Sequence, residues 1–264
     1  MPATVPTLIH RASLIFLAFS AISLCSCKTT KSVLASVSVK PSSFLTHGPE
    51  LKEDRTRSAF LGNWWTSDEK LQAAADATQK LYISPVSIDA VRPMKNYLAK
   101  VEFSDKRRQK KLIELANYAQ KRFVKELKNS KNPRFTLVDM PAADAMKLDL
   151  HLLEWEPGAF TGFIVRETID LITFPALGNL LWKTERAATT IEGRLIEPKS
   201  LKPVFEFADR EEAKTIIVLP AQEVFPSGQA RFAIREWARQ FEVMMANDPA
   251  KRPKDSSPIQ IWAF

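Results

Sequence analysis

The sequence has few of the residue types on which most recognisable chemistry depends. Its 264 residues include only two cysteines, three histidines and seven glycines. So few glycines leave little material for glycine-rich phosphate loops, and neither a P-loop nor a dinucleotide-binding fingerprint is present. Cys25 and Cys27 have no further cysteine or nearby histidine to complete a tetrahedral zinc site, and a disulfide across one residue would be strained. We therefore expect no metal and no cofactor.

The histidines do not form a catalytic arrangement with a nucleophile. After the cysteine pair only His47 and His151 remain, and the sequence contains neither a G-x-S-x-G nor an H-E-x-x-H motif. His151 stands on the polar side of an expected strand, which favours a surface or half-buried position, and His47 stands beside Gly48-Pro49 in a stretch expected to be flexible.

Two acid pairs have a spacing that places both members on one face of a strand. Glu154/Glu156 and Asp209/Glu211 could in principle serve glycoside hydrolysis, which uses paired carboxylates. We favour a solvated strand edge for the first pair and a charged turn over 208–213 for the second. With no nucleophile and base in evidence, we predict that the chain is not an enzyme.

The first residues of the chain have the pattern of an export signal. His10 and Arg11 precede an apolar run over 12–24. A basic start followed by about 7–15 apolar residues is typical of a secretory signal. The run is too short to span a bilayer, which takes about 20 apolar residues. We expect it to be cleaved.

The end of this run resembles the lipobox of bacterial lipoproteins, with Leu24 three positions before Cys27 and small residues between them. The resemblance implies cleavage after residue 26. It further implies that Cys27 is the lipid attachment site, carrying diacylglycerol and an amide-linked acyl chain such as palmitate. Lys28, rather than an aspartate, resembles lipoproteins of the outer membrane, so we expect an anchor there with the chain facing the periplasm.

Composition divides the remainder of the chain into segments. A tether rich in Ser, Thr and Lys precedes a mixed segment that we expect to wrap the domain, with Trp64 and Trp65 partly buried. A regular region follows, and a tail rich in Pro and Lys closes the chain. The expected boundaries are a signal at 1–26, a tether at 27–43, a wrapping segment at 44–79, a domain at 80–247 and a tail at 248–264.

Hydrophobic periodicity predicts the elements of the domain. Strand patterns occupy "KLYISPVSID", "PRFTLVDM" and "KLDLHLLEWE", and a hairpin joins "ATTIEGRLIEP" to "KPVFEFADR" through "PKSLK". Apolar residues recur at helical spacing after Ser104, over 105–128, and again after Ser227. This order predicts an α+β fold, with a mixed, largely antiparallel sheet and two long helices packed on one face.

Four stretches resemble a family of bacterial lipoproteins defined by the domain of unknown function 3313. They are "SSFLTHGPELK", "LYISPVSID", "TTIEGRLIEPKSLKPVFEFADR" and "REWARQFEVMM". The hairpin turn "EPKSLK" departs from the family pattern because it lacks the usual Asp-Ala and Gly. The fold further resembles envelope domains of the TolB N-terminal, curli-secretion-lipoprotein and cell-wall-synthase-activator type, which implies binding of partners rather than turnover of substrates.

One part of the chain is strongly basic. Between Arg92 and Arg134 there are 14 Lys and Arg against four acids, a net of +10, whereas the whole chain carries +8. A solvated helix surface is the simplest explanation, and attraction to an anionic surface is the functional one. We exclude nucleic acid, because the chain is expected to be exported. The candidate anionic-surface patch comprises Lys106, Arg107, Arg108, Lys110 and Lys111.

The segment 158–183 is the most apolar stretch after the signal, although three charged residues interrupt it. Those charges argue against a transmembrane helix. The segment is either core or a cover over the sheet, or it is an exposed contact with a partner or membrane. In the second case the contact residues are Phe160, Phe163, Phe174, Leu177, Leu180 and Trp182.

Together these patterns predict a non-catalytic cell-envelope lipoprotein that binds a protein partner or a cell-wall or other anionic surface. Its partners would be the membrane, through the lipid, and another envelope protein or cell-wall polymer. One alternative is a subunit of an envelope ring or export assembly, and a second, disfavoured one is an envelope hydrolase. The sequence leaves the oligomeric state open.

Overall fold

The computed structural model of the chain describes residues 40–54, 56–95, 97–157, 187–212, 215–216, 227–246, 253 and 259–260. The expected signal, Cys27 and the residues of the expected tether before Lys40 lie outside the described residues. So do Phe160, Phe163, Phe174, Leu177, Leu180 and Trp182, the contact residues expected in segment 158–183.

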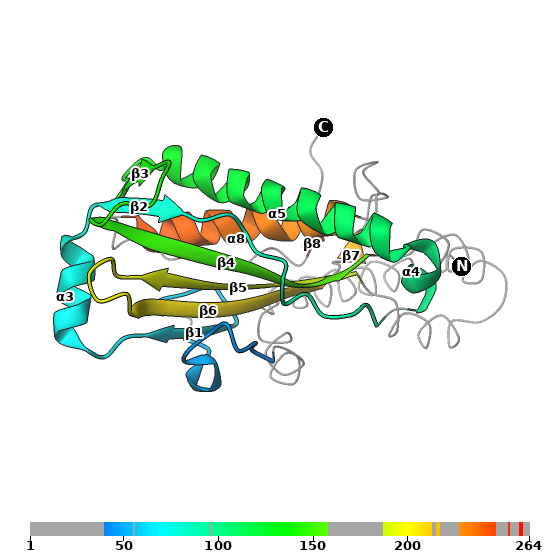
Figure 1. Cartoon of the computed structure of the whole chain (residues 1–264), viewed down its shortest axis with the longest axis horizontal. Helices are drawn as coiled ribbons and strands as arrows, with labels where there is room; N and C mark the ends of the chain where they lie inside the picture. The colour runs from blue at the N-terminus through cyan, green and yellow to red at the C-terminus, as the bar shows by residue number, and fades with distance from the viewer. Residues whose placement is uncertain are drawn as a thin grey trace, which may run out of the picture. The chain divides into compact units, whose positions relative to one another are not determined.

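A six-stranded mixed sheet forms the centre of the described domain (Figure 1). β2 pairs in parallel with β3 and β4, and the other neighbours are antiparallel, so the predicted mixed, largely antiparallel sheet is confirmed. A separate parallel pair joins β7 (Thr215–Ile216) to β8 (Ile259–Gln260). Across the main sheet the order is β1 (Gly62–Trp65), β6 (Pro203–Glu212), β5 (Ala188–Ile196), β4 (Ala145–Glu156), β2 (Lys80–Ile83) and β3 (Thr136–Val138).

Two long helices, α5 (Asp105–Lys128) and α8 (Gly228–Met245), pack against each other and cover one face of this sheet (Figure 1). Both were predicted, and the hydroxyl of Ser104 caps α5 by accepting the N–H of Arg107 at 3.4 Å. Ser227 occupies the N-cap position of α8, but its side chain caps no N–H of that helix. The shorter elements are η1 (Gly48–Glu50), α3 (Glu69–Ala77) and α4 (Tyr97–Glu102).

The core lies between these two helices and the sheet. Phe123 of α5 and Phe207 of β6 both contact Phe241 of α8, with ring centroids 5.7 and 6.2 Å apart. Gly193 of β5 lies opposite Phe207 of β6. A Cβ atom added to Gly193 would overlap the Phe207 ring and come within 2.8 Å of Leu150 Cδ2. Glycine at this position therefore lets the ring pack directly on the strand.

An extra residue in β4 decides which side chains face the core. Leu152 lies opposite Ile191, but the next pair along is Glu154 with Thr190, so Leu153 forms a bulge. Because strand side chains alternate between faces, this bulge turns Trp155 toward the helices and Glu154 and Glu156 toward the opposite face. Trp155 is accordingly 1% exposed, and its ring meets Phe103 edge-on.

Several features differ from the sequence prediction. The segment 44–79 contributes strand β1 and helix α3, and the side chain of Asp68 caps α3 by accepting two backbone N–H groups. Ser42, expected near the end of the tether, is hydrogen-bonded to Glu192 of β5. The charged turn expected over 208–213 is wrong, because residues 208–212 continue β6. Within the described residues, none of the helices is both long enough and apolar enough to cross a membrane.

Candidate functional site

The sheet face opposite the two helices is lined by charged and polar side chains, and we call it the polar face. The antiparallel register aligns these side chains in rows that run across β4, β5 and β6. Alternation explains this, since the neighbouring positions on the same strands supply the core. The rows are Asp149–Arg194–Glu206, His151–Glu192–Ala208, Glu154–Thr190–Arg210 and Glu156–Ala188–Glu212.

Residues 40–50, the strap, bind to this polar face through two buried glutamates. Glu192 accepts hydrogen bonds from the Ser42 backbone N–H at 2.7 Å and from its hydroxyl at 2.6 Å. Glu206 accepts the successive backbone N–H groups of Thr46 and His47 at 2.9 and 2.7 Å. Both glutamates are 0% exposed, so each carboxylate replaces lost water with charge-assisted bonds to the strap.

Two ring stacks add to the hold on the strap. Phe44 stacks on His151 with centroids 3.6 Å apart, while the Arg194 guanidinium lies over the Phe44 ring at 4.3 Å and donates to the Phe44 carbonyl. His47 stacks on Trp64 of β1 at 3.5 Å. The stretch predicted to be flexible around His47 is therefore ordered by a partner ring, and His151 is half-buried as predicted.

Burial sets the electrostatics beneath the strap. It raises the pKa of Glu192, although the hydrogen bonds from Ser42 oppose the shift. Burial also lowers the pKa of His151, and the charge of Arg194 acts in the same direction. For Asp149 burial acts to raise the pKa, but hydrogen bonds from Ser84 and Lys147 outweigh it and the pKa is lowered. The lowered pKa of His151 favours the neutral form of the ring that stacks on Phe44.

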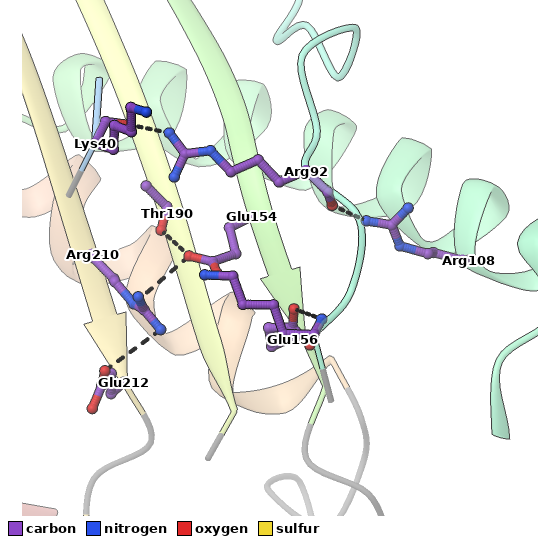
Figure 2. A network of polar contacts seen from close by, with 9 residues as sticks. Lys40, Arg92, Arg108, Glu154, Glu156, Thr190, Arg210 and Glu212 are labelled. Atoms are coloured by element: carbon purple, nitrogen blue, oxygen red, sulfur yellow. Dashed lines mark hydrogen bonds and ion pairs between the residues drawn. The ribbon is translucent and has the colours of Figure 1, made fainter. Parts of the chain in front are cut away.

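A second polar cluster surrounds Glu154. Its carboxylate accepts the Thr190 hydroxyl at 2.8 Å and lies 3.4 Å from Lys95 Nζ and 3.7 Å from Arg210 Nε. Figure 2 shows Arg210 between Glu154 and Glu212. Glu154 and Glu156 are 1% and 5% exposed, so the solvated strand edge expected for this pair is wrong.

The same close-up shows how the strap is linked to the long helix. The Arg92 guanidinium donates to the Lys40 carbonyl at the start of the strap (Figure 2). Arg108 of α5 donates in turn to the Arg92 carbonyl at 2.5 Å. Arg108, expected in the anionic-surface patch, is thus half-buried and bonded within the domain.

The second acid pair, Asp209 and Glu211, lies on the helix-covered side of β6 and is buried. Asp209 accepts the indole N–H of Trp237 from α8 at 2.9 Å. Asp209 therefore joins helix α8 to the sheet. Across the described residues, no group of three or more His, Cys, Asp or Glu side chains is placed to hold a metal ion.

The outer side of α5 carries a different kind of surface. Exposed lysines recur there at helical spacing over a helix of 24 residues, a length of about 36 Å. Two of the three acids of the helix are paired with other cations, Glu114 with Lys111 at 2.7 Å and Glu126 with Arg122 at 2.5 Å, and the third, Asp105, is the first residue of the helix. We call the set the lysine row; it comprises Lys106, Lys110, Lys121, Lys125 and Lys128.

The lysine row only partly matches the predicted patch. Lys106 and Lys110 belong to both, and Arg107 is exposed beside them with its guanidinium 5.5 Å from the Phe103 ring. Sequence reasoning concentrated on the run 106–111 and missed the second half of the row. The signal was present, since the positive excess continues to Arg134. A shallow depression on this second half is lined by Gln120, Lys121, Val124, Lys125, Lys128 and Asn129.

The fold and a comparison with known proteins together define the class of this chain. The fold is an α+β domain, in which two helices cover one face of the sheet and the strap binds to the other. The pattern of the family described as "Protein of unknown function (DUF3313)" matches residues 40–241, and the chain belongs to that family. This confirms the family resemblance found in the sequence.

No curated protein matches the chain. Among solved structures, two PelC dodecamers from Paraburkholderia phytofirmans are similar, and one of them is a single-residue variant. The variant is 9% identical with a TM-score of 0.34, covering 65% of this chain and 89% of that chain. The other is also 9% identical, with a TM-score of 0.36 and coverages of 65% and 90%.

Proposed function

We propose that the protein is a non-catalytic lipoprotein of the cell envelope, anchored through Cys27 in the outer membrane and facing the periplasm. Its domain lies on an anionic membrane surface through the lysine row of α5. The observation that carries the proposal is the row itself: five exposed lysines on one side of one helix.

Electrostatics supports an external anionic partner for this row. Lys106 and Lys110 stand at i and i+4, as do Lys121 and Lys125, and like charges at that spacing destabilise a helix. A layer of phosphate groups facing the row would offset the repulsion between the lysines. Attraction to an anionic surface contributes about 1 kcal/mol of binding free energy per lysine. Lysine is a point charge on a flexible stem, which suits a continuous charged surface better than one fixed anion.

The row would orient the domain rather than anchor it. A diacylglycerol and an amide-linked acyl chain on Cys27 would already hold the protein in the bilayer, since more than one chain gives a stable anchor. The additional basic contact would determine which side of the domain lies against the headgroups.

The state of the buried acids supports a non-catalytic role. Glu192 and Glu206 are engaged by the strap, Glu154 by Thr190 and two cations, and Asp209 by Trp237. A carboxylate used in acid–base chemistry has to reach a substrate proton, and these groups are bonded to the chain itself.

The test uses the full lipid-anchored chain with a fluorophore at Asn117→Cys, an exposed position between the two halves of the row. The chain is reconstituted in phosphatidylglycerol-containing vesicles that also carry a headgroup quencher lipid. We expect quenching. Lys121→Gln with Lys125→Gln should shift the docked-to-undocked ratio by about 25-fold, because each lysine contributes about fivefold.

The matched control is Lys52→Gln with Lys70→Gln, which removes the same charge from exposed positions outside α5. Equal effects of the two pairs would reject the proposal, as would equal quenching in phosphatidylcholine vesicles. Protection of residue 117 only after addition of cell-wall polymer would assign the row to that polymer instead.

A further inference from the structure

The turn that joins β5 to β6 carries an exposed leucine in an unusual conformation. Leu201 is 75% exposed and has a φ of 56°, in the left-handed region. Among the described residues it is the only non-glycine residue with positive φ. Glycine is the usual residue at such a φ, and a bulky side chain is disfavoured there. The backbone conformation therefore does not explain why position 201 is a leucine.

The turn is rigid. The buried Glu197 carboxylate accepts the backbone N–H of Lys199 at 3.1 Å and both the N–H and hydroxyl of Ser200 at 2.6 and 2.7 Å. The backbone closes around it, since Leu201 N–H donates to the Glu197 carbonyl at 3.0 Å and Glu197 N–H donates to the Lys202 carbonyl at 2.9 Å. The conformation of Leu201 is therefore fixed by the turn, and its side chain is held outward.

The residues beside Leu201 indicate what this tip would meet. Lys199 and Lys202 flank it and are exposed, whereas the one acid of the turn, Glu197, is 2% exposed and faces inward. The tip thus presents one apolar side chain between two cations. At a membrane surface, apolar side chains enter the acyl boundary while lysines remain among the phosphates. Charge complementarity therefore favours an anionic lipid surface.

We propose that this tip, residues 198–202, inserts Leu201 into the headgroup–acyl boundary of an anionic bilayer while Lys199 and Lys202 contact lipid phosphates. The proposal rests on the proposed function for the presence of such a bilayer beside the domain, and it adds a second, apolar contact. The hairpin lies at the end of the sheet where β4 begins, since Lys147 is paired with Ile196 (Figure 1).

The experiment places a fluorophore at Leu201→Cys in the full lipid-anchored chain and reconstitutes it in phosphatidylglycerol-containing vesicles. Quenching by a lipid with a nitroxide high on its acyl chain is compared with quenching by aqueous iodide. The control label is Ala90→Cys. This exposed position lies three residues after Ser87, which pairs with His151 in the middle of β4. We expect the label at 201 to be quenched by the lipid and shielded from iodide, and the label at 90 to show the reverse.

The lysines provide the second variant. With the label at 201, Lys199→Gln and Lys202→Gln together should reduce insertion by about 25-fold, at about fivefold per lysine. A label at 201 that remains iodide-accessible, or insertion unchanged in phosphatidylcholine vesicles, would overturn the proposal. If 117 docks and 201 remains in water, the tip proposal alone fails. If neither position docks, the proposed function fails with it.

Discussion

The carboxylate of Glu192 accepts both the backbone N–H and the hydroxyl of Ser42, which precedes it by 150 residues. This single side chain joins the beginning of the described domain to the middle of its sheet. Because the acceptor is fully buried, the interaction is sensitive to small chemical changes.

Glu192→Gln should release the strap around Ser42. The amide offers one acceptor oxygen and places an NH2 donor against the Ser42 donors, so we expect a loss of about 1–3 kcal/mol in the free energy of unfolding. Urea denaturation measures the loss, and hydrogen exchange at the Ser42 amide locates it. Glu212→Gln, on the same sheet face but with its side chain 43% exposed, should change stability by less than about 0.5 kcal/mol. Equal losses in the two variants would contradict this assignment.

His151 should make the domain less stable in mild acid. Its pKa is lowered in the folded protein by burial and by Arg194, so the unfolded chain binds the proton first. Stability is then complete above the ordinary value of 6.5 and falls as the pH drops from there through the folded pKa. His151→Phe, which keeps a ring against Phe44, should flatten the curve of unfolding free energy as the pH falls below 6.5. A slope unchanged by the substitution would refute the prediction.

Insertion of one alanine directly after Glu154 should prevent folding. The added residue would shift the strand beyond it by one position, sending Trp155 toward the polar face and Glu156 toward the core. Loss of a buried tryptophan contact alone costs about 3–5 kcal/mol, and a buried unpaired charge adds to it. Insertion of one alanine after Ala143, in the exposed turn before β4, is the matched control and should give a soluble protein with a cooperative thermal transition.

Leu201→Gly should stabilise the fold while removing the apolar tip. Glycine adopts positive φ without a Cβ penalty, so a gain of about 0.5–1 kcal/mol is expected in denaturant unfolding. Leu201→Ala retains the Cβ and should show no such gain. A less stable glycine variant would mean that Leu201 contributes contacts to the fold, and the tip proposal would lose its premise.

The parts of the fold that could be predicted from the sequence are those where apolar residues recur at regular spacing and those same residues are buried. In α5, Leu112, Leu115 and Phe123 mark the buried stripe directly, and the hairpin of β5 and β6 alternates cleanly up to Ala208. Helix α3 was missed although Asp68 gives a usable N-cap signal, because no long apolar stripe follows it. Short elements depend on their neighbours more than on their own pattern.

The polar face could not be predicted in the same way. The bulge at Leu153 leaves no mark in composition, yet it decides whether Glu154 belongs to solvent, core or polar face. Burial of Glu192 and Glu206 depends on the strap, whose donors are backbone N–H groups that any residue type supplies. The second half of the lysine row was predictable, since Lys121, Lys125 and Lys128 already stand at helical spacing.

The long separation between the strap and its glutamates constrains the order in which the domain matures. Wherever the chain emerges with its N-terminus first, Phe44 and Leu45 appear well over a hundred residues before β5 and β6, the strands that carry Glu192 and Glu206. Contacts this distant in sequence form slowly, because a large loop has to close first. During that interval the two apolar side chains stay uncovered and open to wrong associations. Strap docking therefore has to wait for β5 and β6, so a chain truncated before β6 would leave its own beginning exposed.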